Sequence, residues 1–299
     1  MPNLKEMARC LHTGVRSFVL GANMASMRLL SRPKHAYLYW NACLFLRGSM
    51  GKPTLHKKAI SELFPELLTD AKLSFPELNH AWGWDDPSYL ADLVNLGLLC
   101  AALRPRTVFE IGTSTGYSSL FLAANSAPDV QIWTLDLLTG DAATTSPLTA
   151  RDRDIAKWCR RIEPCFVGHP LGRKIHRLYG DSASFDFAPY RRSIDLFFID
   201  GAHTYEYVRS DTLNALRCCH SGSVIAWHDF GRAGLSRGVT RWLEHLNGIA
   251  RVYTTPGSSV AFMPCDFDCE ALATELGAPS YRSQHGLRTE TSVPRVLSR

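Results

Sequence analysis

Residues 108–119 read Val-Phe-Glu-Ile-Gly-Thr-Ser-Thr-Gly-Tyr-Ser-Ser, and they indicate the fold more clearly than any other stretch. The start is typical of a buried strand, while Ser118 and Ser119 lie where a helix would begin. Gly112 and Gly116 bracket a tight turn between the two. A glycine turn lets a ligand approach the backbone because no Cβ stands in the way, and the helix start adds unpaired N–H groups. The stretch therefore predicts a site for a nucleotide-like ligand.

From about residue 86 the sequence alternates apolar runs with helical patterns. Strands separated by helices predict a parallel sheet wound on both sides, the doubly wound α/β class. Pro256-Gly257 places a turn before the last strand, so the sheet is expected to end in an antiparallel hairpin. The expected strands are 107–111, 130–135, 175–179, 194–199, 223–227, 249–254 and 258–263, and the expected helices are 88–103, 117–125, 205–217 and 237–247.

Outside the alternating region, the sequence predicts a basic N-terminal appendage and a polar tail. Residues 1–60 carry ten Lys or Arg and one acid, Glu6, and an amphipathic helix at 4–22 has a basic polar face. A cap on the sheet domain, a homodimer contact and contact with a membrane surface are the alternatives for this appendage. The expected segments are a helical appendage (1–85, with further helical patterns at 36–47 and 57–72), a sheet domain (86–265) and a C-terminal tail (266–299).

Composition narrows the class of protein. No apolar run reaches the roughly 20 residues of a membrane span. Near the N-terminus we also find no long apolar segment of the kind that a signal peptide contains. The nine cysteines are scattered without a Cys-x-x-Cys pair, which argues against a disulfide scaffold and against a zinc knuckle. We therefore expect a cytoplasmic protein.

The connection at 137–174 is unusually long for a link between two strands, and it contains one short helical pattern at 153–162. An insertion above the carboxyl ends of parallel strands is well placed to cover a substrate. The sequence therefore predicts a substrate lid here.

Two acidic side chains follow strands next to the glycine turn. Asp136 closes the second strand, where a carboxylate can accept hydrogen bonds from both hydroxyls of a ribose. A helix cap or turn residue is the alternative. Asp181 and Ser182 follow the next strand, where an acid either contacts the exocyclic amine of an adenine or is another turn residue.

Two further strands end in groups that suit proton transfer or metal binding. Asp200 and His203 follow one strand, and His228 and Asp229 follow the next. Carboxylates and imidazole that converge in this way can hold a divalent cation; the alternative is two helix caps and a packed histidine. His203 is the candidate general base, because the unperturbed pKa of histidine, about 6.5, suits proton removal near neutrality.

Taken together, these motifs resemble those of class I S-adenosylmethionine-dependent methyltransferases, over about residues 100–263. Glu110-Ile-Gly-Thr-Ser-Thr-Gly-Tyr-Ser118 is similar to the first motif of small-molecule O-methyltransferases related to the catechol and caffeoyl-CoA enzymes. The run from Asp195 to Tyr205, with Trp227-His-Asp229 after it, is closer to the branch called methyltransferase domain 24. The resemblance implies a Rossmann-like, seven-stranded sheet whose last strand is antiparallel.

The resemblance also implies where S-adenosylmethionine binds. Asp136 would hold the ribose, and the adenine would lie near Asp181 and Ser182. The first motif would surround the methionine part, and the candidate cofactor-binding residues are then Glu110, Gly112, Thr113, Ser114, Gly116, Ser118, Asp136, Asp181, Ser182 and Asp200.

In the metal-dependent relatives, an Asp at the position of Asp200 and an Asp-Asp or Asp-Asn pair at the positions of His228 and Asp229 hold magnesium, and a lysine base lies at the position of His203. This chain departs from that pattern at both histidines. Since magnesium prefers oxygen ligands, the resemblance leaves open which metal binds at these residues and whether one binds at all.

We therefore predict a methyltransferase that carries a methyl group from S-adenosylmethionine to an oxygen of a small molecule or sugar, with His203 and Asp200 as catalytic residues. A catalytically silent S-adenosylmethionine-binding or membrane-associated module is the alternative. An NAD-dependent oxidoreductase is disfavoured, because Ser114 takes the place of the middle glycine of G-x-G-x-x-G. No nucleic-acid partner is expected, because the basic charge lies outside the sheet domain.

Overall fold

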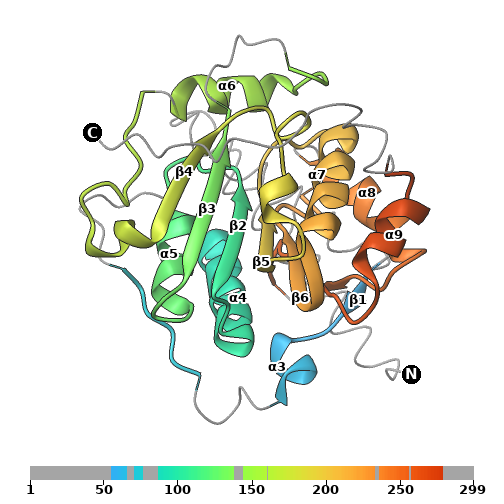
Figure 1. Ribbon diagram of the computed structural model, residues 1–299, viewed down its shortest axis with the longest axis horizontal. Coiled ribbons are helices and arrows are strands. Elements are labelled where there is room, and N and C mark those ends of the chain that lie inside the picture. Colours follow the sequence, from blue (N-terminus) through green and yellow to red (C-terminus); the bar gives the residue numbers. More distant parts are fainter. Residues whose placement is uncertain are drawn as a thin grey trace, which may run out of the picture.

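The computed structural model describes residues 55–65, 71–76, 87–137, 144–159, 161–232, 236–255 and 257–278. The helices expected at 4–22 and 36–47 lie outside these residues. Within them, the chain forms a single mixed sheet with helices on both faces (Figure 1). The predicted doubly wound, Rossmann-like α/β fold is therefore confirmed.

The described sheet has eight strands in the order β1-β7-β8-β6-β5-β2-β3-β4. Neighbouring strands are parallel except around β8, which is antiparallel to both β6 and β7. The predicted antiparallel end of the sheet is thus present. The strands are β1 (His56–Lys57), β2 (Thr107–Ile111), β3 (Gln131–Asp136), β4 (Ile175–Tyr179), β5 (Ile194–Ile199), β6 (Cys219–Trp227), β7 (Tyr253–Thr254) and β8 (Ala261–Pro264).

The central strands are apolar on both sides because helices cover both faces of the sheet. Val108 and Phe109 in β2 and Leu196 and Phe197 in β5 have no exposed surface. Successive residues of a strand point to opposite faces, so burial of consecutive residues requires a cover on each face. This is why the sequence shows continuous apolar runs here and not an alternating pattern.

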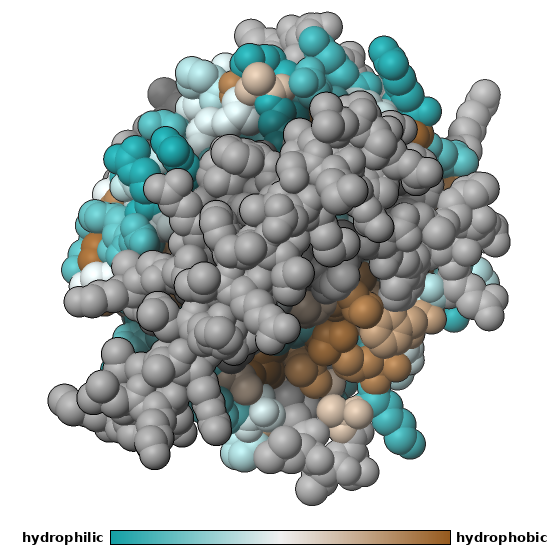
Figure 2. Space-filling view, turned by 180° about the vertical axis from the view of Figure 1, so that it is seen from behind, coloured by the Kyte–Doolittle hydropathy of each residue, from teal (hydrophilic) through white to brown (hydrophobic). Residues whose placement is uncertain are grey.

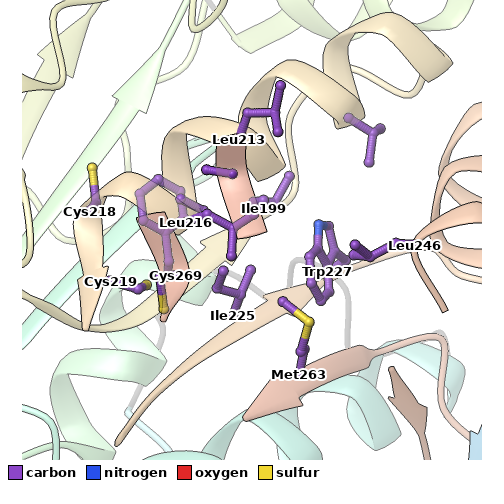
Figure 3. Packing of buried hydrophobic residues seen from close by; sticks show 14 of the residues in the cluster. Ile199, Leu213, Leu216, Cys218, Cys219, Ile225, Trp227, Leu246, Met263 and Cys269 are labelled. Atoms are coloured by element: carbon purple, nitrogen blue, oxygen red, sulfur yellow. The ribbon is translucent and has the colours of Figure 1, made fainter. Parts of the chain in front are cut away.

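Two layers of helices enclose the sheet (Figure 1). On one face lie α4 (Pro87–Leu103) and α5 (Tyr117–Asn125), and on the other lie α7 (Tyr205–Cys218), α8 (Arg237–Asn247) and α9 (Cys269–Glu275). Figure 3 shows the apolar cluster beneath the second layer. Seen from behind, the surface is only partly hydrophilic, since hydrophobic side chains gather low on that face (Figure 2). None of the described helices combines the length and the apolar character that crossing a membrane requires.

The structure differs from the sequence-based expectation at the two ends of the described chain. β1 lies in the predicted helical appendage and adds an eighth strand to the expected seven. Of the helical pattern at 57–72, the structure describes 57–65 and 71–72, and these residues contain one short helix, α3 (Ile60–Leu63). At the other end, the predicted tail contains α9, which begins after the N-cap Asp268 and buries its apolar side into the core. The packed fold therefore extends to residue 278.

A buried hydroxyl joins α7 to β6 and α8. Thr212 accepts hydrogen bonds from the indole N–H of Trp227 at 3.0 Å and of Trp242 at 2.8 Å, and it donates one to the Val208 carbonyl at 2.7 Å. The two tryptophans are the largest fully buried side chains of the described core. Because a buried indole N–H needs an acceptor, Thr212 determines how both rings pack.

Replacing this hydroxyl should destabilise the protein. Thr212→Val keeps the shape of the side chain but leaves two buried indole donors without their acceptor, which should lower the free energy of unfolding by about 2–5 kcal/mol. Thr212→Ser keeps the hydroxyl and loses one methyl group, so it should cost only about 1 kcal/mol. Urea unfolding of the three proteins measures the difference; equal destabilisation by both variants would contradict the role of the hydroxyl.

Candidate active site

A cavity of about 250 Å³ lies at the carboxyl ends of β2, β3, β5 and β6. Parallel strands in a doubly wound sheet present the residues that follow them at this edge. The helix α6 (Ala150–Cys159) lies across the same edge (Figure 1), and its residues form one wall of the cavity. The insertion therefore lies where the sequence predicted it. The cavity is lined by Ile111, Gly112, Ser114, Leu135, Asp136, Leu137, Leu148, Arg151, Asp152, Ile155, Ala156, Cys159, Gly180, Asp181, Ser182, Asp200, Gly201, Ala202, His203, Tyr207, His228, Asp229 and Arg232.

The glycine turn after β2 is required by backbone packing. Gly112 has φ +105°, and a Cβ there would lie 2.1 Å from the carbonyl oxygen of Asp200, at the end of the neighbouring β5. Gly116 has φ +76°, and a Cβ there would lie 2.6 Å from the ring of Phe166. Gly112 lines the cavity and Gly116 does not. The turn therefore brings two strand ends together, in addition to leaving Gly112 open to a ligand.

Ser114 and Asp136 form the first polar wall of the cavity. Asp136 closes β3 and accepts hydrogen bonds from the backbone N–H groups of Leu137, at 2.9 Å, and of Ser114. Burial raises the pKa of Asp136, although these bonds and the nearby Arg177 act in the opposite direction. Ser114 has φ +47°, a left-handed conformation that is uncommon for residues other than glycine. The serine thus adopts a glycine-like backbone where the dinucleotide motif has its middle glycine.

Asp181 forms the second polar wall of the cavity, after β4. It accepts hydrogen bonds from the backbone N–H of Thr145 at 2.7 Å, the N–H of Ala183 at 3.0 Å and the hydroxyl of Tyr207 at 3.0 Å. Burial would raise the pKa of Asp181, but these hydrogen bonds outweigh it and lower the pKa below its usual value. Asp181 is therefore an ionised acceptor on the wall of the cavity.

Of the ten candidate cofactor residues, six line the cavity and four lie behind it. The six are Gly112, Ser114, Asp136, Asp181, Ser182 and Asp200, and the four are Glu110, Thr113, Gly116 and Ser118. The role of these four residues in binding the cofactor stays a prediction. The strand period turns Glu110 into the core, and the start of α5 buries Ser118.

Glu110 is a fully buried carboxyl group in the core behind the cavity. The hydroxyls of Ser119 and Thr134 donate hydrogen bonds to its Oε2, the latter at 2.6 Å. Burial raises its pKa to about 7, and the hydroxyls of Ser118, Ser119 and Thr134 only partly counter this shift. Through these hydrogen bonds Glu110 links α5 and β3 to β2, the strand that leads into the glycine turn.

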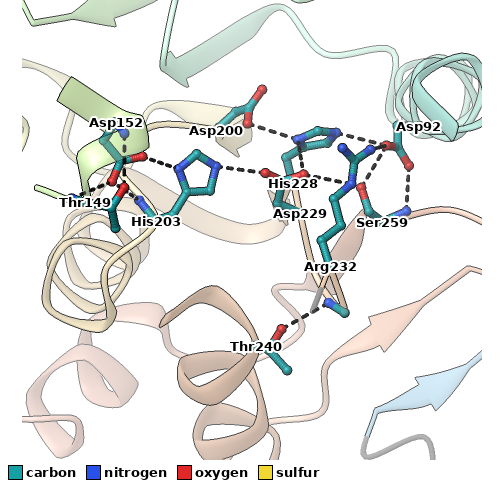
Figure 4. A network of polar contacts seen from close by, with 11 residues as sticks. Asp92, Thr149, Asp152, Asp200, His203, His228, Asp229, Arg232, Thr240 and Ser259 are labelled. Atoms are coloured by element: carbon teal, nitrogen blue, oxygen red, sulfur yellow. Dashed lines mark hydrogen bonds and ion pairs between the residues drawn. The ribbon is translucent and has the colours of Figure 1, made fainter. Parts of the chain in front are cut away.

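The other half of the cavity is a chain of ionic contacts (Figure 4). His203 Nδ1 lies 2.6 Å from Asp152 Oδ1, and His203 Nε2 lies 2.8 Å from Asp229 Oδ2. Burial favours the neutral ring, but the hydrogen bonds to the two carboxylates raise the pKa of His203 to about 10. Asp152 is held by the backbone N–H of Thr149 and of His203. His203 therefore joins α6 to the end of β6.

His228 continues this chain of contacts away from α6. Its Nδ1 lies 3.1 Å from Asp200 Oδ1 and 3.2 Å from Asp229 Oδ1, and its Nε2 lies 2.9 Å from Asp92 Oδ2. Arg232 bridges the same carboxylates, at 2.9 Å from Asp229 and 3.0 Å from Asp92. Burial alone would lower the pKa of His228, but the carboxylates of Asp200 and Asp229 raise it well above the usual value.

No sequence pattern indicated a role for Asp92, Asp152 or Arg232. Asp92 lies on α4 and is 136 residues from His228, while Asp152 lies on α6 and is 51 residues from His203. Asp92 and Asp152 are each a single acidic residue on a helix, and such residues are common on solvent-exposed surfaces. Only the packing of α4 and α6 against the sheet brings these acids to the histidines.

His203, the predicted general base, offers no free ring nitrogen in this conformation. A base needs a ring nitrogen with a free lone pair. Both nitrogens of His203 face carboxylates, and a carboxylate only accepts hydrogen bonds, so both nitrogens carry a proton. The unperturbed pKa suited a base, but the two neighbouring acids were not visible in the sequence.

The predicted metal site of Asp200, His228 and Asp229 does not fit the observed arrangement. A metal ligand must offer a lone pair, yet both ring nitrogens of His228 point at carboxylates. Among the described residues, no group of three or more His, Cys, Asp or Glu side chains is arranged to hold a metal ion. The three residues do converge as predicted, but as an ion cluster.

Comparison with known proteins agrees with this architecture. Residues 109–230, which run from β2 to just beyond β6, match the family model described as a methyltransferase domain. This match agrees with the class predicted from the sequence motifs, an S-adenosylmethionine-dependent methyltransferase of the domain 24 branch. No curated protein matches the sequence.

The fold is also similar to that of solved methyltransferases of low sequence identity. The O-methyltransferase TomG from Streptomyces achromogenes is 18% identical, over 75% of this chain and 96% of its own, with a TM-score of 0.40. An O-methyltransferase from Bacillus cereus is 19% identical, over 75% of this chain and 98% of its own, with a TM-score of 0.41. A methyltransferase from Geobacter sulfurreducens is 19% identical, over 57% and 76%, with a TM-score of 0.37.

The raised pKa of Glu110 predicts a specific pH dependence of stability. The carboxyl has an ordinary pKa of 4.5 and a folded value of about 7, so between these pH values the unfolded chain releases the proton first. The free energy of unfolding should therefore fall as pH rises from 4.5 to 7, by about 3 kcal/mol. The glutamine of Glu110→Gln cannot ionise, so the free energy of unfolding of this variant should not show this decrease.

Urea unfolding of both proteins at pH 5 and pH 8 measures the difference. The other titrating groups are common to the two proteins and cancel in the comparison. The same pH dependence in wild type and Glu110→Gln would show that Glu110 ionises normally and contradict this expectation.

Proposed function

We propose that this protein transfers a methyl group from S-adenosylmethionine to an oxygen of a small molecule or sugar. The observation that carries the proposal is the single cavity that combines Asp136 and Asp181 on one side with Asp200 on the other. The acceptor is a small molecule in this proposal because the excess of basic residues lies at 1–60, outside residues 109–230, which match the methyltransferase domain. The cofactor supplies a methyl group that is already activated on a sulfonium.

Asp136, Asp181 and Gly112 fit the polar parts of this cofactor. Asp136 offers a carboxylate at the end of β3 to the ribose hydroxyls, and its orientation is fixed by two backbone N–H groups. Asp181 is ionised and lies beside Ser182, which suits the exocyclic amine of the adenine. Gly112 leaves room on the cavity wall for the methionine part. Each group is held before the cofactor arrives, so little ordering is needed on binding.

Asp200 is the proton acceptor in this proposal. Its side chain is 25% exposed, whereas Asp92, Asp152 and Asp229 are at most 8% exposed. Asp200 is therefore the carboxylate of the ion cluster that a bound hydroxyl can reach. When the acceptor oxygen forms its bond to the methyl carbon, the carbon–sulfur bond breaks and the hydroxyl proton passes to Asp200. His203 stays protonated and positions Asp229 and α6.

A catalytically silent S-adenosylmethionine-binding module is the second candidate. The observation that favours it is the saturation of the ion cluster, in which both ring nitrogens of His203 and of His228 already face carboxylates. In a silent module, the cluster would be a structural core of the cavity wall. The two candidates share the cofactor and differ only in turnover.

Calorimetry tests the cofactor half of the site. The wild type should bind S-adenosylhomocysteine and not NAD. Asp136→Asn should weaken S-adenosylhomocysteine binding by about tenfold or more, because a charge-assisted hydrogen bond to the ribose is lost. Asp195→Asn is the matched control, since Asp195 also accepts backbone hydrogen bonds but lies at the opposite end of β5. Preference for NAD, or equal affinity in Asp136→Asn and wild type, would refute the assignment.

Transfer of labelled methyl groups to a panel of catechols, phenols and sugars tests the acceptor half of the site. Asp200→Asn should lower kcat by about a hundredfold and weaken S-adenosylhomocysteine binding far less, because the proton acceptor is lost while Asp136, Asp181 and Gly112 still contact the cofactor. Unchanged kcat in Asp200→Asn would exclude Asp200 as the base. A wild type that binds S-adenosylhomocysteine but methylates no member of the panel would favour the silent module.

A further inference from the structure

The ring of His228 lies at the point where three carboxylates from separate elements meet. Asp200 follows β5, Asp229 follows β6, and Asp92 comes from α4. Nδ1 lies between Asp200 and Asp229 at 3.1 and 3.2 Å, and Nε2 lies 2.9 Å from Asp92. In Figure 4 the ring lies between Asp92 on one side and Asp200 and Asp229 on the other. The centre of the acidic group is therefore filled by an imidazole.

Asp92 is an ionised acceptor, as its donors show. The backbone N–H of Ser259 reaches Oδ1 at 2.6 Å, and the guanidinium of Arg232 reaches Oδ2 at 3.0 Å. Neither donor can accept a hydrogen bond, so both carboxylate oxygens are acceptors. The hydroxyls of Ser258 and Ser259 add bonds of 2.7 and 2.8 Å. The Nε2 of His228, which faces Oδ2, must then carry a hydrogen atom.

The opposite nitrogen of His228 faces two further carboxylate oxygens. Asp229 accepts a hydrogen bond from His203 through Oδ2 at 2.8 Å, and its Oδ1, which has no hydrogen bond, lies in ion-pair contact with Arg232 at 2.9 Å and with Nδ1 of His228 at 3.2 Å. Because Asp229 is ionised, this contact favours a hydrogen atom on Nδ1. An imidazole with a proton on each nitrogen is a cation without a lone pair. It can neutralise the acids around it, and it cannot ligate a metal.

The side-chain cations of the cluster offset all but one of its negative charges without a metal ion. The carboxylates are Asp92, Asp152, Asp200 and Asp229, and the cations are His203, His228 and Arg232. Buried carboxylates are stable only when each is paired with a cation or a set of donors. A divalent ion between Asp200 and Asp229 would have to displace the ring of His228 and leave Asp92 with one cation fewer.

We propose that His228, fixed by Asp92, is a built-in cation that occupies the place between Asp200 and Asp229 where a divalent metal would bind, and that the site works without a metal. The inference concerns the site of the proposed methyl transfer, but its test needs neither an acceptor nor turnover. A result that contradicts the role of His228 would therefore not contradict the proposed methyl transfer. A fixed cation beside the cavity favours the anionic form of a bound hydroxyl, as a metal does, but it offers no coordination position.

Manganese binding tests this proposal directly. The full-length protein is dialysed against EDTA, the EDTA is removed, and Mn²⁺ is titrated while the free ion is followed by electron paramagnetic resonance. The wild type should not bind Mn²⁺ at this site. His228→Asn replaces the ring by an amide that can offer an oxygen to the metal and a donor to Asp92, so it should gain one Mn²⁺ per chain. His220→Asn, an exchange on the same strand far from the cavity, should gain none.

Each outcome decides the proposal. Stoichiometric binding of Mn²⁺ by the wild type would overturn it, and that result does not depend on whether the variant folds. A His228→Asn protein that melts cooperatively and binds S-adenosylhomocysteine but gains no Mn²⁺ would also overturn it, because the ring would then not be what closes the site. If His220→Asn also bound Mn²⁺, the binding would be adventitious, and this would contradict the assignment to His228.

Discussion

The contact of the His228 ring with Asp92, Asp200 and Asp229 is the interaction on which the rest of the site depends. Three carboxylates in a buried place repel one another, and removing each from water costs several kcal/mol. The ring is the group that touches all three. Without a cation there, α4 and the carboxyl ends of β5 and β6 would not remain at their observed separation.

From this centre the contacts extend to both borders of the cavity. Arg232 ties Asp229 to Asp92, and His203 ties Asp229 to Asp152 on α6. The wall formed by α6 is therefore attached to the sheet by a charged hydrogen bond, which is stronger than a neutral one. The opposite half of the cavity is different, because Asp136 and Asp181 are oriented mainly by backbone N–H groups. One half of the site thus presents fixed polar groups to a ligand, and in the other half three cations offset all but one of the carboxylate charges.

Much of the fold could be predicted from the sequence because it depends on local patterns. The helices expected at 117–125 and 237–247 are observed as α5 and α8 with the same bounds, and the strand ends correctly placed Asp136 and Asp200 at one edge. What could not be predicted depends on tertiary contacts. β1 has two residues and exists only through its pairing with β7. Asp92 and Asp152 look like ordinary helical acids until α4 and α6 pack.

The same limit explains why the surroundings of the two histidines were not predicted. Sequence spacing brought His203, His228 and Asp229 together correctly, because parallel strands end at one edge. The chemistry of an imidazole, however, is set by what lies beside each ring nitrogen. Carboxylates lie at both nitrogens of both rings, which turns a predicted base and a predicted metal ligand into two cations.

The protonation state of these rings is therefore the central claim. Nitrogen-15 spectra of histidine-labelled protein, assigned with His203→Gln and His228→Asn, report whether each ring nitrogen carries a proton. At pH 7.5, well above the usual pKa of about 6.5, both nitrogens of His203 and of His228 should be protonated. A neutral ring at either position, with one unprotonated nitrogen, would contradict the account.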